Sequence, residues 1–182
     1  MSQAAVKMPL TKANALARSI VNELAPCCQR IEVAGSIRRC QEEVGDIEIV
    51  AVPKRAQGLF EASDNAMTQL DEKLNLLVME ERLTRIKDGP RYKQAWVVRH
   101  GIKLDLFLCQ ERSWGIIFAI RTGPVEFAKR LVTPVCKGGY LPDELSVRDG
   151  CLWMGDLAIE TYEERDLFRA LGLGWLEPRD RK

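Results

Sequence analysis

The segment that most constrains the fold is VAGSIRRCQEEVGDIEIVAV, residues 33–52, because it carries two acids inside an apolar run. Buried strands normally exclude charge. Side chains alternate along a strand, so Asp46 and Glu48 point to one face while Ile47 and Ile49 point to the other. Two like charges on one face repel each other unless a positive group lies between them. The segment therefore predicts a half-buried strand whose acidic face requires a positive partner, and a metal ion is the natural candidate.

A second apolar run, IKLDLFL at residues 102–108, contains another isolated acid. The same alternation places Asp105 on the face opposite Leu104 and Leu106. If the two strands are neighbours, three carboxylates share one sheet face, and oxygen-only ligation suits Mg²⁺ or Mn²⁺ rather than zinc. Spacing alone leaves open the alternative that each acid pairs with an arginine on an exposed face.

Gly35 and Ser36 precede the acidic strand and indicate a phosphate-binding loop. A glycine that ends a strand and opens a helix lets backbone N–H groups approach phosphate oxygens. Ser36 adds a hydroxyl, and Arg38 and Arg39 add planar donors suited to phosphate. Gly-Ser alone is a weak signal, but its combination with two arginines and Gly-Asp-x-Glu is specific. The segment joins a phosphate cradle to a metal site.

The pattern of the whole chain predicts an α/β lobe over residues 1–110, followed by a smaller α+β lobe over residues 111–182. In the first lobe the predicted elements are a helix that Thr11 caps and Pro26 stops, strands in IEVAG and DIEIVAV, a helix from Ala66 to Val78, and a hairpin of WVVR and IKLDLFL around His100-Gly101. In the second lobe they are a helix in PVEFAKRLV, a hairpin turning at Asp149-Gly150, and a helix with a Thr161–Glu164 capping box that ends at Gly172.

Composition sets limits on location and partners. No apolar run is long enough to span a membrane, and the first residues lack the apolar core of a signal peptide, so we expect a cytoplasmic protein. The net charge of +1 means that any contact with a polyphosphate depends on local clusters rather than on a global field. Six cysteines without a C-x-x-C pair, and one histidine, argue against a structural zinc site.

The motifs resemble those of a known family. GSIRRCQEEVGDIEIVAV is similar to the core motif of the DNA polymerase beta superfamily of nucleotidyltransferases, and more specifically to the family X DNA polymerases. KLDLFL resembles that family's third-carboxylate strand, and RTGP resembles its Thr-Gly turn. KMPLTKANALARSI resembles the segment leading into the palm, and ETYEERDLFRALGLGWLEPRDR resembles the EP-x-x-R ending. The resemblance covers nearly the whole chain in order, and it implies a nucleotidyltransferase palm followed by a small thumb-like lobe.

The resemblance also implies residue roles. Asp46 and Glu48 would bridge two Mg²⁺ ions, for which Mn²⁺ can substitute, and Asp105 would bind only the catalytic ion and accept the proton of the attacking hydroxyl. The Gly35 backbone, Ser36 and Arg39 would hold the β- and γ-phosphates. Lys7 falls where family members often carry an arginine for the same phosphates, whereas Arg38 is expected to be structural.

Departures from the family pattern fall at the metal site and the sugar pocket. Glu48 stands where the family commonly has aspartate. Ile120 and Arg121 replace the aromatic pair that usually precedes the Thr122-Gly123 turn, which leaves the sugar preference open. Arg121, Thr122 and Gly123 are still expected to bind the nucleotide, with Arg121 stacking on a base or gripping a phosphate. The alternative for Arg121 is an ordinary surface arginine.

Two further expectations concern the second lobe. The family turn contains a cis peptide after its glycine, so we predict a cis Gly123–Pro124 bond; the alternative is that Pro124 simply starts a helix. From the resemblance we expect the chain to lack the family's additional N-terminal DNA-binding segments. Binding of DNA is therefore assigned to Lys129, Arg130 and Lys137. The alternative is that these residues form an ordinary solvated basic face.

The leading functional hypothesis is a metal-dependent nucleotidyltransferase that adds nucleotides from dNTPs to a nucleic-acid 3′-hydroxyl and releases pyrophosphate. Filling of short gaps in DNA is the expected activity, which makes nucleoside triphosphates and gapped or primer–template DNA the expected partners of a monomeric enzyme. The alternatives are template-independent tailing, nucleotide transfer to RNA or protein, and a catalytically inactive nucleotide-binding module.

Overall fold

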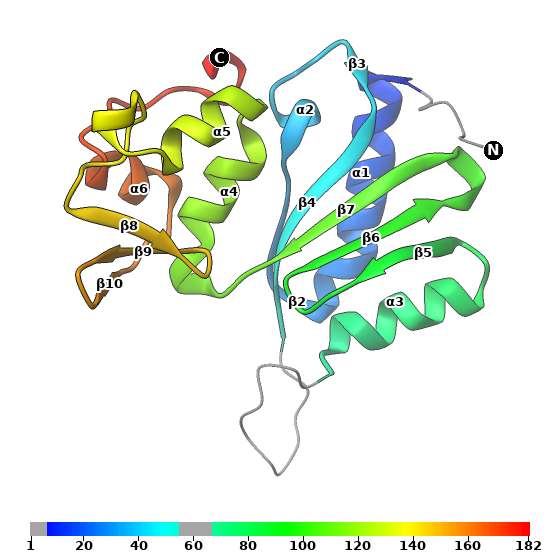
Figure 1. The fold of residues 1–182 in the computed structure, drawn as a ribbon. Helices are drawn as coiled ribbons and strands as arrows, with labels where there is room; N and C mark the ends of the chain where they lie inside the picture. Colours follow the sequence, from blue (N-terminus) through cyan, green and yellow to red (C-terminus); the bar gives the residue numbers. More distant parts are fainter. Residues whose placement is uncertain (1–6, 55–66) are drawn as a thin grey trace.

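The computed structural model describes residues 7–54 and 67–182 (Figure 1). Its helices are α1 (Leu10–Leu24), α2 (Gly35–Arg38), α3 (Gln69–Met79), α4 (Trp114–Thr122), α5 (Val125–Val132) and α6 (Glu164–Ala170). Its strands are β1 (Met8–Pro9), β2 (Cys28–Val33), β3 (Glu43–Val44), β4 (Asp46–Pro53), β5 (Leu83–Asp88), β6 (Tyr92–Val97), β7 (Ile102–Leu108), β8 (Leu145–Arg148), β9 (Cys151–Met154) and β10 (Leu157–Ile159). None of these described helices is both long enough and apolar enough to cross a membrane.

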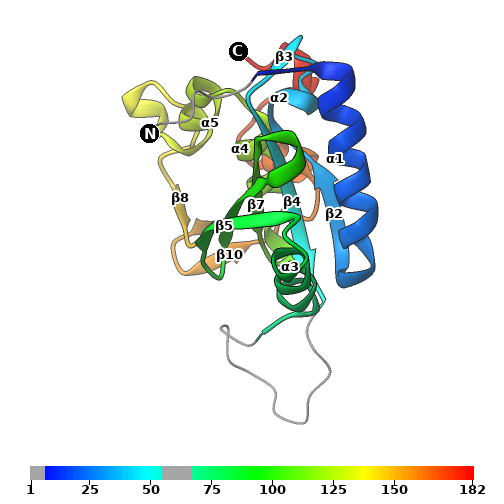
Figure 2. The same ribbon diagram turned by 90° about the vertical axis from the view of Figure 1, so that its right-hand side faces the viewer.

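A five-stranded mixed sheet organises the first part of the chain, in the order β2-β4-β7-β6-β5. Strands β4 and β7 run parallel, and the other neighbours are antiparallel. The alternating apolar residues of β4 and β7 pack against α1 and α3 in one hydrophobic cluster. Figure 2 shows α1 alongside β2, and α3 farther along the sheet near β5. Both helices therefore cover the same face of the sheet and leave the acidic face to the rest of the chain.

A second hydrophobic cluster belongs to the elements from α4 onward, which lie together at the left of Figure 1. It joins apolar residues of α4, α5 and α6 to the antiparallel β10-β9-β8 sheet. A smaller cluster connects the two parts, because Val50, Val52 and Phe107 of the large sheet pack against Trp114 and Phe118. The observed mixed α/β fold with a small second lobe agrees with the predicted fold class.

The acidic face of β4 changes character along the strand. Asp46 and Glu48 come first, and Val50 and Val52 follow on the same face because strand side chains alternate. The apolar end docks against α4, while the charged end does not join that cluster. One strand face thus supplies both the acids and the connection to the second lobe.

Helix starts differ from the prediction at both long helices. Helix α1 begins at Leu10 after Pro9, without a side-chain cap, so Thr11 is inside the helix rather than at its cap. Helix α3 begins at Gln69, where Thr68 and Asp71 form the capping box. The predicted start at Ala66 lies outside the described residues. Strand β5 has no counterpart among the predicted elements, because its exposed residues show no clear alternation.

The predicted capping box of the last helix is wrong. Glu163 and Asp166 form the box, not Thr161 and Glu164. Thr161 is fully buried, and its hydroxyl accepts a hydrogen bond from the Ile116 N–H at 3.2 Å. The helix therefore starts two residues later than predicted, which turns Glu164 into the interior.

The predicted cis bond at Gly123–Pro124 is also wrong, because no cis peptide occurs among the described residues. Pro124 has φ of −64° and immediately precedes α5. This conformation matches the alternative interpretation, in which the proline begins a helix.

Candidate active site

The register of β4 against β7 determines where the three predicted acids lie. Glu48 is the Cα partner of Asp105, and Asp46 is the partner of Lys103. Residues directly opposite each other on paired strands share a face, so all three carboxylates lie on the sheet face that α1 and α3 leave free. Two strands that are distant in sequence thereby place on one sheet face the acids that the sequence singles out.

These acids repel one another and are not neutralised by ion pairs. Burial, with the charges of Asp46 and Asp105 adding to it and Arg39 opposing, raises the pKa of Glu48 to about 7. Burial and Asp105 likewise raise the pKa of Asp46, against Lys103 and Arg39. Within residues 7–54 and 67–182 none of the three forms a salt bridge, which does not favour the arginine-pairing alternative. The face therefore concentrates acidic groups whose charge nearby Arg39 and Lys103 offset only in part.

The three carboxylates are chemically suited to a hard divalent cation, although their side chains are not gathered around one point. No three histidine, cysteine, aspartate or glutamate side chains of the described residues are gathered tightly enough to form a ready-made metal site. Carboxylate oxygens on a shared, partly buried face are nevertheless the ligands that Mg²⁺ and Mn²⁺ select. Asp46, Glu48 and Asp105 are therefore the residues that would hold such ions, after side-chain adjustment.

Gly35 packs directly beneath Glu48. It has φ of +60°, and a Cβ there would lie 1.8 Å from Glu48 Oε2, so only glycine is compatible with this contact. The Ala34 N–H donates to the Glu48 carbonyl at 2.8 Å, which fixes the loop to β4. The acid and the glycine loop are thus held as one unit.

Ser36 carries an unpaired polar atom in this loop. Its Oγ is buried and has no hydrogen-bond partner among the described residues. A buried hydroxyl without a partner costs about 1–3 kcal/mol, so such atoms call for a ligand or another explanation. A phosphate oxygen is a suitable partner for this hydroxyl.

Arg39 and Thr122, both predicted to bind nucleotide, bind each other in this structure. Arg39 Nη1 donates to the Thr122 carbonyl at 2.5 Å, and Arg38 Nη1 donates to the Thr122 hydroxyl at 2.7 Å. Thr122 is fully buried. Gly123 follows at the end of α4, where a Cβ would lie 2.6 Å from Phe127 Cδ1. The Thr-Gly turn is thus fixed to the glycine loop through two arginines.

Arg121 lies beside the acidic face without pairing to it. Its guanidinium carbon is 3.9 Å from the centre of the Phe107 ring, and Phe107 stacks with Tyr92 at 5.1 Å. Arg121 is exposed and forms no salt bridge within the described part of the chain. It is available to a ligand that approaches the acids.

The other predicted cations do not gather at the acids. Lys7 forms an exposed 2.9 Å ion pair with Glu43, and Lys129 forms one of the same length with Glu126. Arg130 lies over the Tyr140 ring at 4.1 Å. Lys137 ends the short 3₁₀ turn Val135–Lys137. The structure places the last three on the second lobe and Lys7 next to the β1–β3 pair.

Two partners of Asp105 escape the sequence analysis. Tyr92 Oη and Gln94 Nε2 both donate to Asp105 Oδ1, each at 2.8 Å. The sequence prediction starts this strand at Trp96, whereas β6 starts at Tyr92. In YKQAWV, every second residue from Tyr92 through Gln94 to Trp96 lies on one face of the strand. This alternation is the sequence signal that could have identified Tyr92 and Gln94.

A buried ion-pair network between the lobes also escapes the sequence analysis. Arg38 donates to both carboxylate oxygens of Glu164, at 2.9 and 2.6 Å, and Arg181 donates to the same carboxylate at 2.6 Å. Glu164 is 5% exposed and the Arg181 side chain is fully buried. The structural role expected for Arg38 agrees with these contacts.

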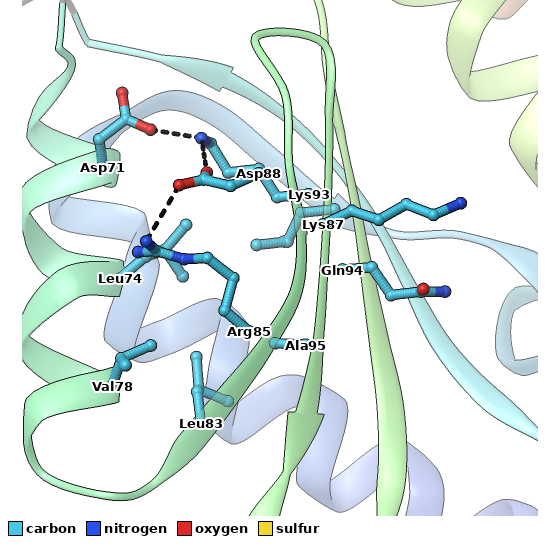
Figure 3. A pocket seen from close by; sticks show the side chains of 11 residues that line it. Asp71, Leu74, Val78, Leu83, Arg85, Lys87, Asp88, Lys93, Gln94 and Ala95 are labelled. Carbon is cyan, nitrogen blue, oxygen red and sulfur yellow. Dashed lines mark hydrogen bonds and ion pairs between the residues drawn. The ribbon is translucent and has the colours of Figure 1, made fainter. Parts of the chain in front are cut away.

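A small pocket of about 30 Å³ lies away from the acids, between α3 and strands β5 and β6 (Figure 3). Lys93 pairs there with Asp71 at 2.7 Å and with Asp88 at 2.5 Å. Leu106, which lines the pocket, belongs to the core face of β7. Figure 3 shows the Lys87 and Gln94 side chains pointing away from this pocket. The pocket is thus on the opposite side of the sheet from the candidate site.

The mixed sheet with flanking helices and a small second lobe defines a polymerase-beta-like palm-and-thumb fold. Among solved structures, the chain is similar to a crystal structure of Leishmania infantum polymerase beta in a ternary P/T complex, with a TM-score of 0.75. The sequence identity is 16%, and the match covers 97% of this chain and 77% of that chain. At this identity the likeness shows the fold. No protein-family model and no curated protein matches the chain.

Proposed function

We propose that this protein is a metal-dependent nucleotidyltransferase that joins nucleotides to a nucleic-acid 3′-hydroxyl. The observation that carries the proposal is the parallel register that pairs Glu48 with Asp105, next to Gly35 and Ser36. Acids that form no salt bridge, beside a loop with an unpaired buried hydroxyl, suit a substrate that combines a metal ion with a polyphosphate. The similarity to the fold of polymerase beta supports the same class of chemistry.

The proposed roles follow from what each side chain presents. Asp46, Glu48 and Asp105 would hold the divalent ions, which when bound neutralise the attacking and leaving oxygens. Ser36 Oγ and the Gly35 backbone bind the β- and γ-phosphates, and Asp105 accepts the proton of the attacking hydroxyl. Because Arg39 already donates to the Thr122 carbonyl, it connects the phosphate loop to the second lobe while adding positive charge near the acids.

Arg121 is the residue that bears on substrate choice. Its guanidinium, stacked on Phe107, offers a cation and a planar surface beside the acids. An arginine at this position supports template-independent tailing as a second candidate activity, since a stacking cation holds a base without requiring a template partner. Gap filling on DNA, with Lys129, Arg130 and Lys137 on the backbone of the duplex, remains the first candidate.

The test incubates the protein and Mg²⁺ or Mn²⁺ with labelled dNTPs or NTPs on gapped DNA, single-stranded DNA or RNA. Extension that follows the template supports gap filling, and extension of single strands supports tailing. Asp105→Asn should abolish either activity, whereas the matched Asp149→Asn, which changes an exposed acid paired with Arg91, should not. Triphosphate binding without any transfer would contradict the catalytic proposal and favour an inactive binding module.

A further inference from the structure

The neighbours of Asp105 differ on its two sides. On one side β4 presents Glu48, another acid. On the other side β6 runs antiparallel to β7, with Gln94 as the Cα partner of Asp105 and Tyr92 as the partner of Phe107. Opposite residues of antiparallel strands share a face, so β6 directs two neutral hydrogen-bond donors toward the same carboxylate.

Both donors bind one oxygen of that carboxylate. Tyr92 Oη and Gln94 Nε2 each lie 2.8 Å from Asp105 Oδ1, and no donor within the described part of the chain reaches Oδ2. Asp105 is only 8% exposed, so its charge is stabilised mainly by the groups that touch it. The two bonds therefore fix the carboxylate's orientation and leave one oxygen free.

The two donors are themselves held in place. The Tyr92 ring stacks on Phe107 with an interplanar angle of 14°, and Lys87 Nζ lies 5.3 Å from the centre of the same Tyr92 ring. Gln94 is partly buried in the middle strand of the β5-β6-β7 array. Fixed donors hold a reactive group in position without the entropy cost of ordering it at each turnover.

We infer that Tyr92 and Gln94 are positioning residues that occupy Asp105 Oδ1, so that Oδ2 is the oxygen open both to the attacking hydroxyl and to the divalent ion that Asp105 would hold. The inference rests on the proposed function. In the step concerned, the 3′-hydroxyl proton passes to Oδ2, the hydroxyl oxygen forms a bond to the α-phosphorus, and the bond from that phosphorus to the bridging oxygen breaks. Pyrophosphate leaves with that bond's electron pair. Without the donors on Oδ1 the carboxylate can rotate, so the free oxygen is no longer aligned with the hydroxyl.

The first experiment compares single-turnover nucleotide addition by the wild type, Tyr92→Phe, Gln94→Met and the double variant. We expect each single change to slow addition about 10-fold and the double change about 100-fold. The Kd for an α,β-non-hydrolysable dNTP and the unfolding midpoint should change little. Tyr162→Phe is the matched control, because it also removes a hydroxyl bonded to a carboxylate, that of Glu160, but on the surface.

The second experiment uses the metal-free protein and does not depend on turnover. The side-chain amide signals of Gln94 in ¹H–¹⁵N spectra, identified by their loss in Gln94→Met, should shift in Asp105→Asn. They should not shift in Asp149→Asn. An unchanged Gln94 signal in Asp105→Asn would show that the contact is absent and would overturn the inference.

The kinetic outcomes separate the inference from the proposed function. An active wild type with full rates in both single variants overturns only the roles of Tyr92 and Gln94. An equal loss of rate and of nucleotide affinity also overturns them, because a merely structural role would weaken both. If Tyr92→Phe unfolds, the Gln94→Met result decides. A wild type that transfers no nucleotide overturns the proposed function and, with it, these roles.

Discussion

Two glutamates of this protein, the partly buried Glu48 and the buried Glu164, both lose contact with water, yet their pKa values shift in opposite directions. Burial, aided by Asp46, raises the pKa of Glu48 to about 7. Burial also acts on Glu164, but hydrogen bonds from Arg38 and Arg181 outweigh it and lower the pKa of that carboxyl. The difference is therefore not how deeply each acid lies but what surrounds it.

The surroundings match two different tasks. Glu164 joins the lobes, because Arg38 belongs to α2 of the first part and Arg181 to the end of the chain. A buried carboxylate with two arginine partners is neutralised by them and does not require a further cation. Glu48 has two acidic neighbours whose effect outweighs that of nearby Arg39 and Arg121, and it forms no salt bridge within the described residues, so a cation would lower the free energy of the site.

Among the variants that test the contrast between Glu48 and Glu164, the largest expected effect is on activity. Glu48→Ala should reduce nucleotide transfer about 10³-fold or more, since it removes a carboxylate that holds the metal. The free energy of unfolding should stay the same or rise, because the change also removes a repulsive charge. Single-turnover assays and urea unfolding measure the two quantities. Glu43→Ala, an exposed acid of β3, is the control; equal turnover in the two variants would remove Glu48 from the site.

The next effect is on stability. Glu164→Gln should lower the free energy of unfolding by about 3 kcal/mol, because it leaves two arginines sharing a neutral partner in the interior. Urea unfolding of the variant measures this loss. A smaller loss than that of a surface pair would show that the carboxylate does not hold the lobes together, and the contrast with Glu48 would fail.

The sequence predicts the acidic face because its basis is local. Alternation along a strand fixes that Asp46 and Glu48 share a side, whatever the strand pairs with. The fold class follows in the same way from the alternation of helical and strand patterns. The pairing of Glu48 with Asp105 needs a parallel register between segments more than 50 residues apart, and neither segment alone contains it.

What the sequence misses depends on tertiary contacts, either between the lobes or between neighbouring strands of the large sheet. Thr161 and Glu164 fit the capping-box pattern better than Glu163 and Asp166 do. The observed helix start follows instead from tertiary contacts, because Thr161 binds the Ile116 N–H and Glu164 turns inward to Arg38 and Arg181. Tyr92 and Gln94 are missed because polar residues within a half-covered strand weaken its apolar pattern. Their importance appears only when β6 lies against Asp105.

The pH dependence of stability sharpens the comparison further. Between the ordinary pKa of 4.5 and about 7, folded Glu48 keeps a proton that the unfolded chain has lost. The folded state then binds more protons, so the free energy of unfolding falls as pH rises through this window, by roughly 3 kcal/mol in total. Glu164 acts in the opposite direction, and only as pH falls below its ordinary value.

Urea unfolding of the metal-free protein between pH 5 and pH 7.5 measures this slope. Glu48→Gln should flatten it, although the raised pKa of Asp46 leaves a remainder. Glu164→Gln should keep the slope while lowering the whole curve. A wild-type stability that rises through the same window would contradict the raised pKa of Glu48.

The variant with the smallest expected effect tests whether burial explains how strongly Glu164 connects the two lobes. Glu163, next to Glu164, accepts two hydrogen bonds from Arg30, at 2.7 and 2.9 Å, but its side chain is 59% exposed. Water competes for both partners, and Arg30 also stays stacked on Trp114 at 4.2 Å, so Glu163→Gln should lower stability by less than about 1 kcal/mol. Raised salt should leave the Glu163→Gln and wild-type proteins equally stable, because exposed pairs are screened. A loss as large as that of Glu164→Gln would mean that the number of arginine contacts, rather than their removal from water, sets the strength of the connection.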